Sequence, residues 1–72
     1  MELKWTMPYD IAIELDEKFG YSPKEVLQIR FTDLHTWVCD LDGFNDDPNS
    51  SNEKILEAIQ MAWLEEAKLN HS

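Results

Sequence analysis

Residues 50–68 read SSNEKILEAIQMAWLEEAK and carry the strongest helical signal in the chain. Ser50 and Glu53 have the spacing of a capping box, in which each side chain satisfies a free backbone N–H at the start of a helix. Apolar residues then recur every three or four positions, as on one helix face: Ile55, Leu56, Ile59, Ala62 and Trp63. The stretch predicts a long helix from this box to about Lys68, with a frayed tail from about residue 69.

Two shorter helices are predicted in the N-terminal half of the chain. Pro8 opens a segment whose apolar residues have helical spacing, and Gly20 ends it as a C-terminal cap. A second capping box follows directly, formed by Ser22 and Glu25 with a proline at the first helical position. It predicts a short helix from Pro23 to about Leu27.

A third helix is predicted from Asp33 to Leu41, where an apolar stripe has three-four spacing and Gly43 provides the stop. Two short segments, 3–6 and 29–32, each hold a basic residue, an aromatic residue and a threonine before a helix. We expect them to pair as strands. The predicted fold is a single, mostly α domain over residues 1–72, with about four helices and one short strand pair.

The net charge of −9 excludes several classes of function. Six Lys+Arg against fifteen Asp+Glu cannot form the basic stripe that nucleic acid requires, and they disfavour binding to an anionic membrane surface. No apolar run is long enough for a spanning helix. One cysteine excludes an internal disulfide and a bound iron-sulphur cluster, so any metal must be held mainly by oxygen. We expect a cytoplasmic protein whose partners are cations or basic protein surfaces.

The most acidic stretch follows the third predicted helix, where four aspartates lie between Asp40 and Asp47. Hard cations prefer several such oxygens, and like charges this close repel each other until a cation or a basic partner binds. The candidate metal ligands are Asp42, Asp46, Asp47, Glu53 and Glu57. The alternative is a solvated acidic loop beside a helix N-terminus. The sequence leaves open whether Glu14 and Glu17 of the first helix share this patch.

Two smaller constellations have competing explanations. His35, Cys39 and Asp42 lie on one side of a helix and offer a redox-sensitive metal site, or else His35 caps the helix and Cys39 packs half-buried. Met61 and Leu64 are expected on the outer face of the last helix, as a docking patch or as a second core contact. With two histidines and two glycines, the chain offers no typical catalytic site, and we expect a non-enzymatic protein.

Four segments together have the pattern of a known family. They are Leu3-Lys4-Trp5-Thr6; Arg30-Phe31-Thr32-Asp33 with His35, Trp37, Cys39, Asp40 and Leu41; Phe44 with Asp46-Asp47-Pro48; and 51–60 with Trp63-Leu64. From Leu3 to about Ala67 the sequence resembles the IscX family of accessory proteins in bacterial iron-sulphur cluster assembly. It departs from the pattern at Met7, at Gly43 and Asn45, and in the longer stretch 25–29.

The resemblance implies a small winged-helix-like domain that binds ferrous iron through an acidic surface. Oxygen-only ligands should bind this ion weakly and exchange it quickly, and a single cysteine leaves no bound cluster. The resemblance also implies docking on the cysteine desulfurase IscS, in competition with bacterial frataxin, and modulation of cluster assembly. We expect the protein to be a monomer. The residues expected to contact a partner are Asp40, Asp42, Asp46, Asp47, Glu57, Met61 and Leu64. The alternative function is a metal-independent acidic protein-interaction module.

Overall fold

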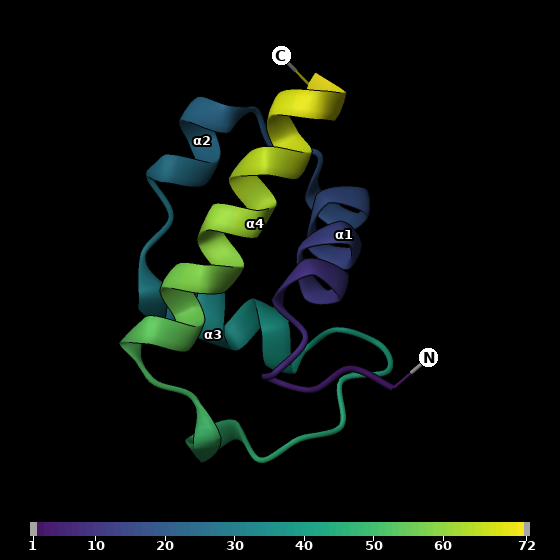
Figure 1. The fold of residues 1–72 in the computed structure, drawn as a ribbon, viewed down its shortest axis with the longest axis vertical. Helices are drawn as coiled ribbons and strands as arrows, with labels where there is room; N and C mark the ends of the chain where they lie inside the picture. Colours follow the sequence, from purple (N-terminus) through teal and green to yellow (C-terminus); the bar gives the residue numbers. More distant parts are fainter. Residues whose placement is uncertain (1, 72) are drawn as a thin grey trace.

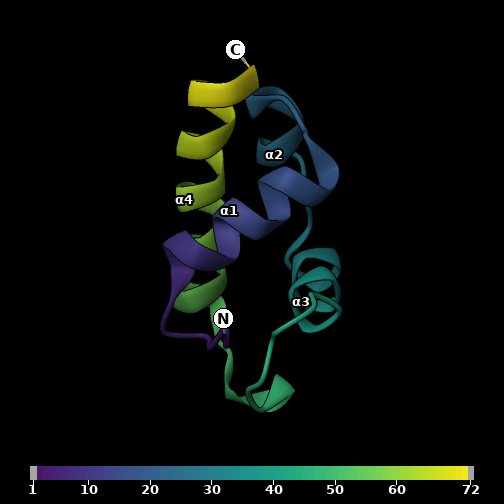
Figure 2. The same ribbon diagram turned by 90° about the vertical axis from the view of Figure 1, so that its right-hand side faces the viewer.

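The computed structural model describes residues 2–71, which form helices joined by short loops (Figure 1). Along the chain they are α1 (Pro8–Phe19), α2 (Pro23–Leu27), α3 (Phe31–Cys39), the short 3-10 helix η1 (Pro48–Ser50) and α4 (Glu53–His71). α4 is the central element, because α1, α2 and α3 all pack against it. Figure 2 shows α4 and α3 at opposite edges of the view, with α1 crossing between them. Within residues 2–71, no helix combines the length and the apolar character needed to cross a membrane.

The first two helices confirm the predictions from the sequence. α1 has its proline at the first helical positions and ends at Gly20, whose φ of 63° is left-handed and therefore suits glycine. α2 has the predicted capping box: the Glu25 N–H donates to Ser22 Oγ, and the Ser22 N–H donates to Glu25 Oε1. Local signals were sufficient at both helices because each contains its own start and stop.

The other two helices differ from the predictions at their ends. α3 begins at Phe31 rather than Asp33 and ends at Cys39 rather than Leu41. α4 begins at Glu53, where the side chain of Asn52 accepts a hydrogen bond from the Ile55 N–H at 2.9 Å. The predicted Ser50–Glu53 capping box is therefore wrong, because Ser50 belongs to η1.

Residues 2–71 contain no β-strand, so the predicted strand pair and the winged-helix-like fold are both wrong. The segment 29–32 does not stay extended, since Phe31 opens α3 and packs its ring against the core. Leu3 instead forms an isolated parallel bridge with Phe44. The Leu3 N–H donates to Gly43 O at 2.8 Å, and the Asn45 N–H donates to Leu3 O at 2.9 Å. The N-terminal segment thus pairs with the acidic loop and not with residues 29–32.

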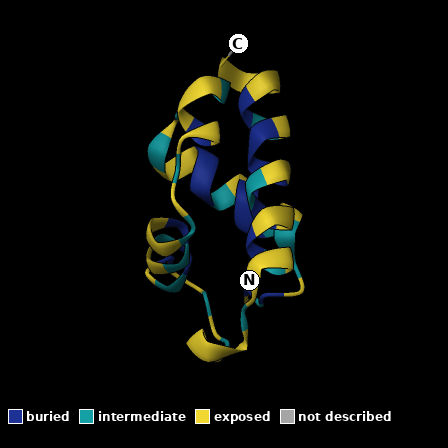
Figure 3. Ribbon diagram, turned by 90° about the vertical axis from the view of Figure 1, so that its left-hand side faces the viewer, coloured by how far each residue is buried: buried dark blue, intermediate teal, exposed yellow. Residues whose placement is uncertain are grey.

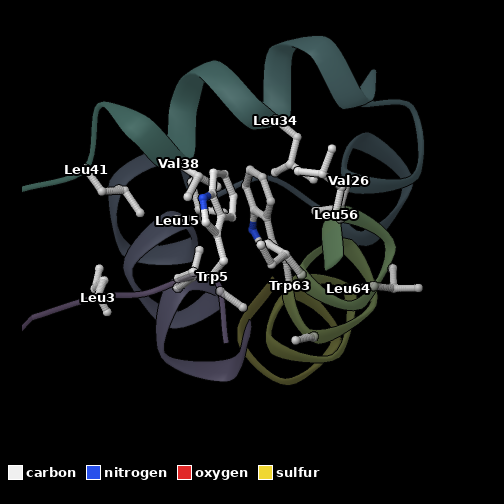
Figure 4. Packing of buried hydrophobic residues seen from close by; sticks show 14 of the residues in the cluster. Leu3, Trp5, Leu15, Val26, Leu34, Val38, Leu41, Leu56, Trp63 and Leu64 are labelled. Atoms are coloured by element: carbon white, nitrogen blue, oxygen red, sulfur yellow. The ribbon is translucent and has the colours of Figure 1, made fainter. Parts of the chain in front are cut away.

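The core lies between α4 and the other helices, whose inward faces are buried and whose outward faces are exposed (Figure 3). Trp63 of α4 is fully buried, and Figure 4 shows its ring beside that of Trp5 and near the Leu34 side chain. Leu64 is only 6% exposed and also belongs to the core. Each large side chain buried in this way contributes about 1.5–3 kcal/mol.

A buried carboxylate holds the C-terminal turn of α4 against α1. Asp16 of α1 is 5% exposed, and its Oδ2 accepts a hydrogen bond from Asn70 Nδ2 at 2.9 Å. His71 Nε2 lies 3.0 Å from Asp16 Oδ1. α4 therefore continues beyond the end predicted at Lys68 and reaches His71.

Candidate functional site

The acidic loop after α3 is tied to the N-terminal segment by contacts between residues far apart in sequence. Beside the Leu3 hydrogen bonds, Lys4 Nζ donates to Asn45 O at 2.6 Å. The indole N–H of Trp5 donates to Asp47 O at 2.7 Å, and the Trp5 ring packs edge-on against Phe44 with 4.8 Å between centroids. Because Trp5 is only 2% exposed, it anchors the loop to the core.

Asp46 is held by two backbone N–H groups. Its Oδ2 accepts from the Trp5 N–H at 3.0 Å, and its Oδ1 accepts from the Asp47 N–H at 2.8 Å. These hydrogen bonds, with Trp5 the stronger cause, hold the pKa of Asp46 below its ordinary value, and the charge of Lys4 acts in the same direction. Both oxygens of this predicted metal ligand therefore shape the loop.

Asp47 caps η1. Its Oδ1 accepts a hydrogen bond from the Asn49 N–H at 2.9 Å, as the capping residue of a short helix does. The remaining Asp47 carboxylate oxygen lies on an exposed residue. Asp47 therefore has a local structural role. Because the residue is exposed, that role is compatible with binding.

Asp42 has different neighbours from Asp46 and Asp47. It lines a surface hollow of about 360 Å³ together with Leu41 and with Glu14, Glu17 and Lys18 of α1. Asp42 thus shares a patch with the carboxylates of the first helix, which answers the question that the sequence left open. The helical spacing of the sequence predicts that Glu14 and Glu17 lie on the outward face of α1. The position of Asp42 beside them follows only from the fold.

Glu53 and Glu57 are both exposed at the start of α4. Within residues 2–71, no three His, Cys, Asp or Glu side chains are close enough together to hold a metal ion. The five predicted metal ligands are therefore spread over the surface rather than gathered in one preformed site.

The apolar half of the predicted docking patch divides between surface and core. Met61 is 50% exposed on α4, as expected for the outer face. The expectation that Leu64 shares that face is wrong, because Leu64 is buried. The burial of Leu64 is what the alternative, a second core contact of α4, predicts.

His35 connects α3 to the loop and is not a helix cap. Its Nε2 lies 2.6 Å from Pro48 O, and since a carbonyl only accepts, this ring nitrogen carries the proton. The His35 ring also stacks on Trp5, with 5.4 Å between centroids and 25° between planes. The histidine therefore supports the same anchor as the indole of Trp5.

Cys39 lies beside His35 and is half-buried, as the packing alternative predicts. Its Sγ is 4.0 Å from His35 Nδ1. Burial, and secondarily the charge of Asp40, raises the pKa of the thiol, which keeps it protonated. Asp42 lines the hollow on α1, so the structure does not assemble the predicted trio of His35, Cys39 and Asp42 into a metal site.

Comparison with known proteins shows which family the chain belongs to. A profile described as iron-sulphur cluster assembly matches residues 3–68. The chain is also 54% identical, over 67 residues, to an uncharacterized protein of Pseudomonas aeruginosa. That match covers 92% of this chain and 97% of the relative.

Proposed function

Because the chain belongs to the iron-sulphur cluster assembly family, also called the IscX or YfhJ family, we propose that it is an acidic accessory protein of cluster assembly. In this role it docks on a cysteine desulfurase, where it competes with bacterial frataxin, and binds ferrous iron weakly. The observation that carries the proposal is the family match over residues 3–68. The net charge of −9 supports docking on a basic surface, and such docking weakens as salt is added.

Ferrous iron is proposed as an exchangeable cargo bound by surface carboxylates. Asp42, Glu53 and Glu57 are exposed, whereas both oxygens of Asp46 already accept backbone hydrogen bonds. Oxygen ligands that are not gathered in advance must be brought together by the ion, so affinity is low and exchange is fast.

The iron proposal is tested by anaerobic titration with ferrous iron while amide resonances are followed. We expect paramagnetic broadening at Asp42 and between Glu53 and Glu57, and less broadening in an Asp42→Asn variant. A Glu65→Gln variant is the matched control, because Glu65 is an exposed carboxylate elsewhere on α4. Broadening that is confined to other residues, or that both variants reduce equally, contradicts this assignment.

A second function, a metal-independent acidic interaction module, is favoured by one observation. The carboxylates of residues 2–71 do not form a group able to hold a metal ion. Desulfurase binding measured with chelator and with ferrous iron distinguishes the two functions. If the Asp42→Lys and Glu57→Lys variants lose binding in metal-free buffer, the module is supported; if they lose only the effect of iron on desulfurase activity, the iron-binding adaptor is supported.

Docking itself is tested by titrating the cysteine desulfurase with the wild-type protein at low and high salt. We expect binding that falls steeply with salt, and displacement of the protein by added bacterial frataxin. Absence of binding at low salt contradicts the proposed function.

A further inference from the structure

The face shared by α1 and α3 joins two features that are distant in sequence. One is the acidic hollow, and the other is a group of aromatic rings at the end of α1. Lys18 belongs to both, because it lines the hollow and its Nζ lies 5.7 Å from the centre of the Phe19 ring. We call this surface the α1–α3 face, and its residues are Glu14, Glu17, Lys18, Phe19, Tyr21, Trp37 and Asp42.

The aromatic rings of the α1–α3 face form a supported stack. Phe19 lies 5.3 Å from Tyr21 and 4.8 Å from Trp37, measured between ring centroids. All three residues are partly buried and pack against the core, and each keeps part of its surface exposed. Beneath them Trp63 is fully buried, with ring centroids 5.9–6.4 Å away. Rings fixed in this way keep a surface that attracts cations through the negative charge of the aromatic face.

The protein already places one cation on this surface. The Lys18 ammonium lies over Phe19 at the edge of a hollow that Glu14, Glu17 and Asp42 line. The structure therefore shows a positive group over an aromatic face, at a hollow that carboxylates also line. The position of the Lys18 ammonium is defined by its contact with the Phe19 ring, and it does not depend on how many carboxylates line the hollow.

The acidic rim extends along α3 beside Trp37. Asp33 lies four residues before Trp37, and Asp40 lies three residues after it, so both carboxylates project from the same side of the helix as the indole. Both are exposed. An incoming cation at Trp37 therefore meets carboxylates on either side.

We propose that the α1–α3 face binds an arginine-bearing basic segment of a partner protein, whose guanidinium takes the place that Lys18 occupies in the free molecule. A guanidinium is planar, stacks on aromatic rings and donates to carboxylates at the same time. A metal ion does not gain from stacked rings in this way, and nucleic acid is repelled by the carboxylates. This inference rests on the proposed function in one respect, which is that the partner is identified as the desulfurase.

The test compares two lysine variants that change the net charge equally. Lys18→Gln removes the cation from the face, whereas Lys54→Gln removes one from the start of α4, beside Glu53 and Glu57. Each variant and the wild type are titrated with a labelled hexa-arginine peptide at low salt. We expect Lys18→Gln to bind the peptide about threefold more tightly than Lys54→Gln, because it removes a competitor for the aromatic face.

The aromatic part is tested separately at Trp37. We expect Trp37→Leu to weaken peptide binding about threefold and Trp37→Phe to restore most of it, because phenylalanine keeps an aromatic face. Tyr9→Leu is the control, since Tyr9 is exposed on α1 outside this face. Circular dichroism of each variant separates loss of binding from loss of fold, and the Phe variant keeps the test open if the Leu variant unfolds.

Three outcomes overturn the proposal: no peptide binding by the wild type, equal effects of Lys18→Gln and Lys54→Gln, or a larger effect of Lys54→Gln. The last result would place binding at the start of α4. The same variants are then titrated with the desulfurase. If the peptide results hold and the desulfurase is not bound, the proposed function fails while the α1–α3 face stands.

Discussion

Replacing Trp5 by phenylalanine tests whether the N-terminal segment anchors the acidic loop. The substitution removes the indole N–H that donates to Asp47 O at 2.7 Å, and it shrinks a ring that is 2% exposed. One lost hydrogen bond costs about 1 kcal/mol, and the lost ring volume costs about 1–2 kcal/mol. For a domain of this size, a loss of roughly 2 kcal/mol lowers Tm by about 10 °C.

The matched control is Trp63→Phe. Trp63 is also buried, but its indole N–H has no hydrogen-bond acceptor among residues 2–71. This variant therefore loses ring volume alone, and we expect it to lose about 1 kcal/mol less stability than Trp5→Phe. Urea denaturation gives both free energies of unfolding.

A local measurement separates anchoring of the loop from general destabilisation. In Trp5→Phe we expect faster hydrogen exchange at the Asn45 amide, which donates to Leu3 O, and unchanged relative protection in α4. The reasoning is refuted if Trp5→Phe is no less stable than Trp63→Phe and the Asn45 amide keeps its protection.

Three further predictions concern titratable groups. Folding lowers the pKa of Asp46, so its contribution to stability is present above the unfolded pKa of about 3.9 and is lost as pH falls through the folded pKa. Asp46→Asn should therefore weaken the fall in the free energy of unfolding at acid pH, as measured by urea titrations. The raised pKa of Cys39 predicts slower alkylation than a free thiol at mildly alkaline pH, and a rate equal to that of a denatured control contradicts it. Asp16→Ala should cost about 1–3 kcal/mol and loosen the last turn of α4, because Asn70 and His71 lose their partner; unchanged exchange at the end of α4 would contradict this role.

The helices were predictable to the extent that their signals are local. Ser22 and Glu25 cap α2, and Gly20 ends α1, because each signal acts within a few residues. The start of α4 was not predictable from spacing alone. Ser50 and Asn52 are both good capping residues, and Ser50 is unavailable because the turn that Asp47 caps includes it.

The residues of the candidate site could be predicted from the sequence, but their arrangement in space could not. Asp42 and Asp46 are close in sequence, yet Asp42 faces α1, while Asp46 binds the backbone of Trp5. That separation depends on contacts across about forty residues, for which periodicity and spacing give no signal. The same limit explains the wrong strand pair, since Leu3 found a partner at Phe44.

The link between residues 3–5 and the acidic loop also has a consequence for motion. Its hydrogen bonds join the loop to a segment that lies outside every helix, and an opening that separates the two from the helices also withdraws the buried side chains of Leu3 and Trp5 from the core. Such an opening frees the Asp46 carboxylate from the Trp5 N–H, and its free energy includes the cost of exposing Leu3 and Trp5. In native-state hydrogen exchange, the loop and the N-terminal segment should therefore behave as one cooperative unit, and a partner that binds the open loop would be selecting a minor conformation of the folded protein.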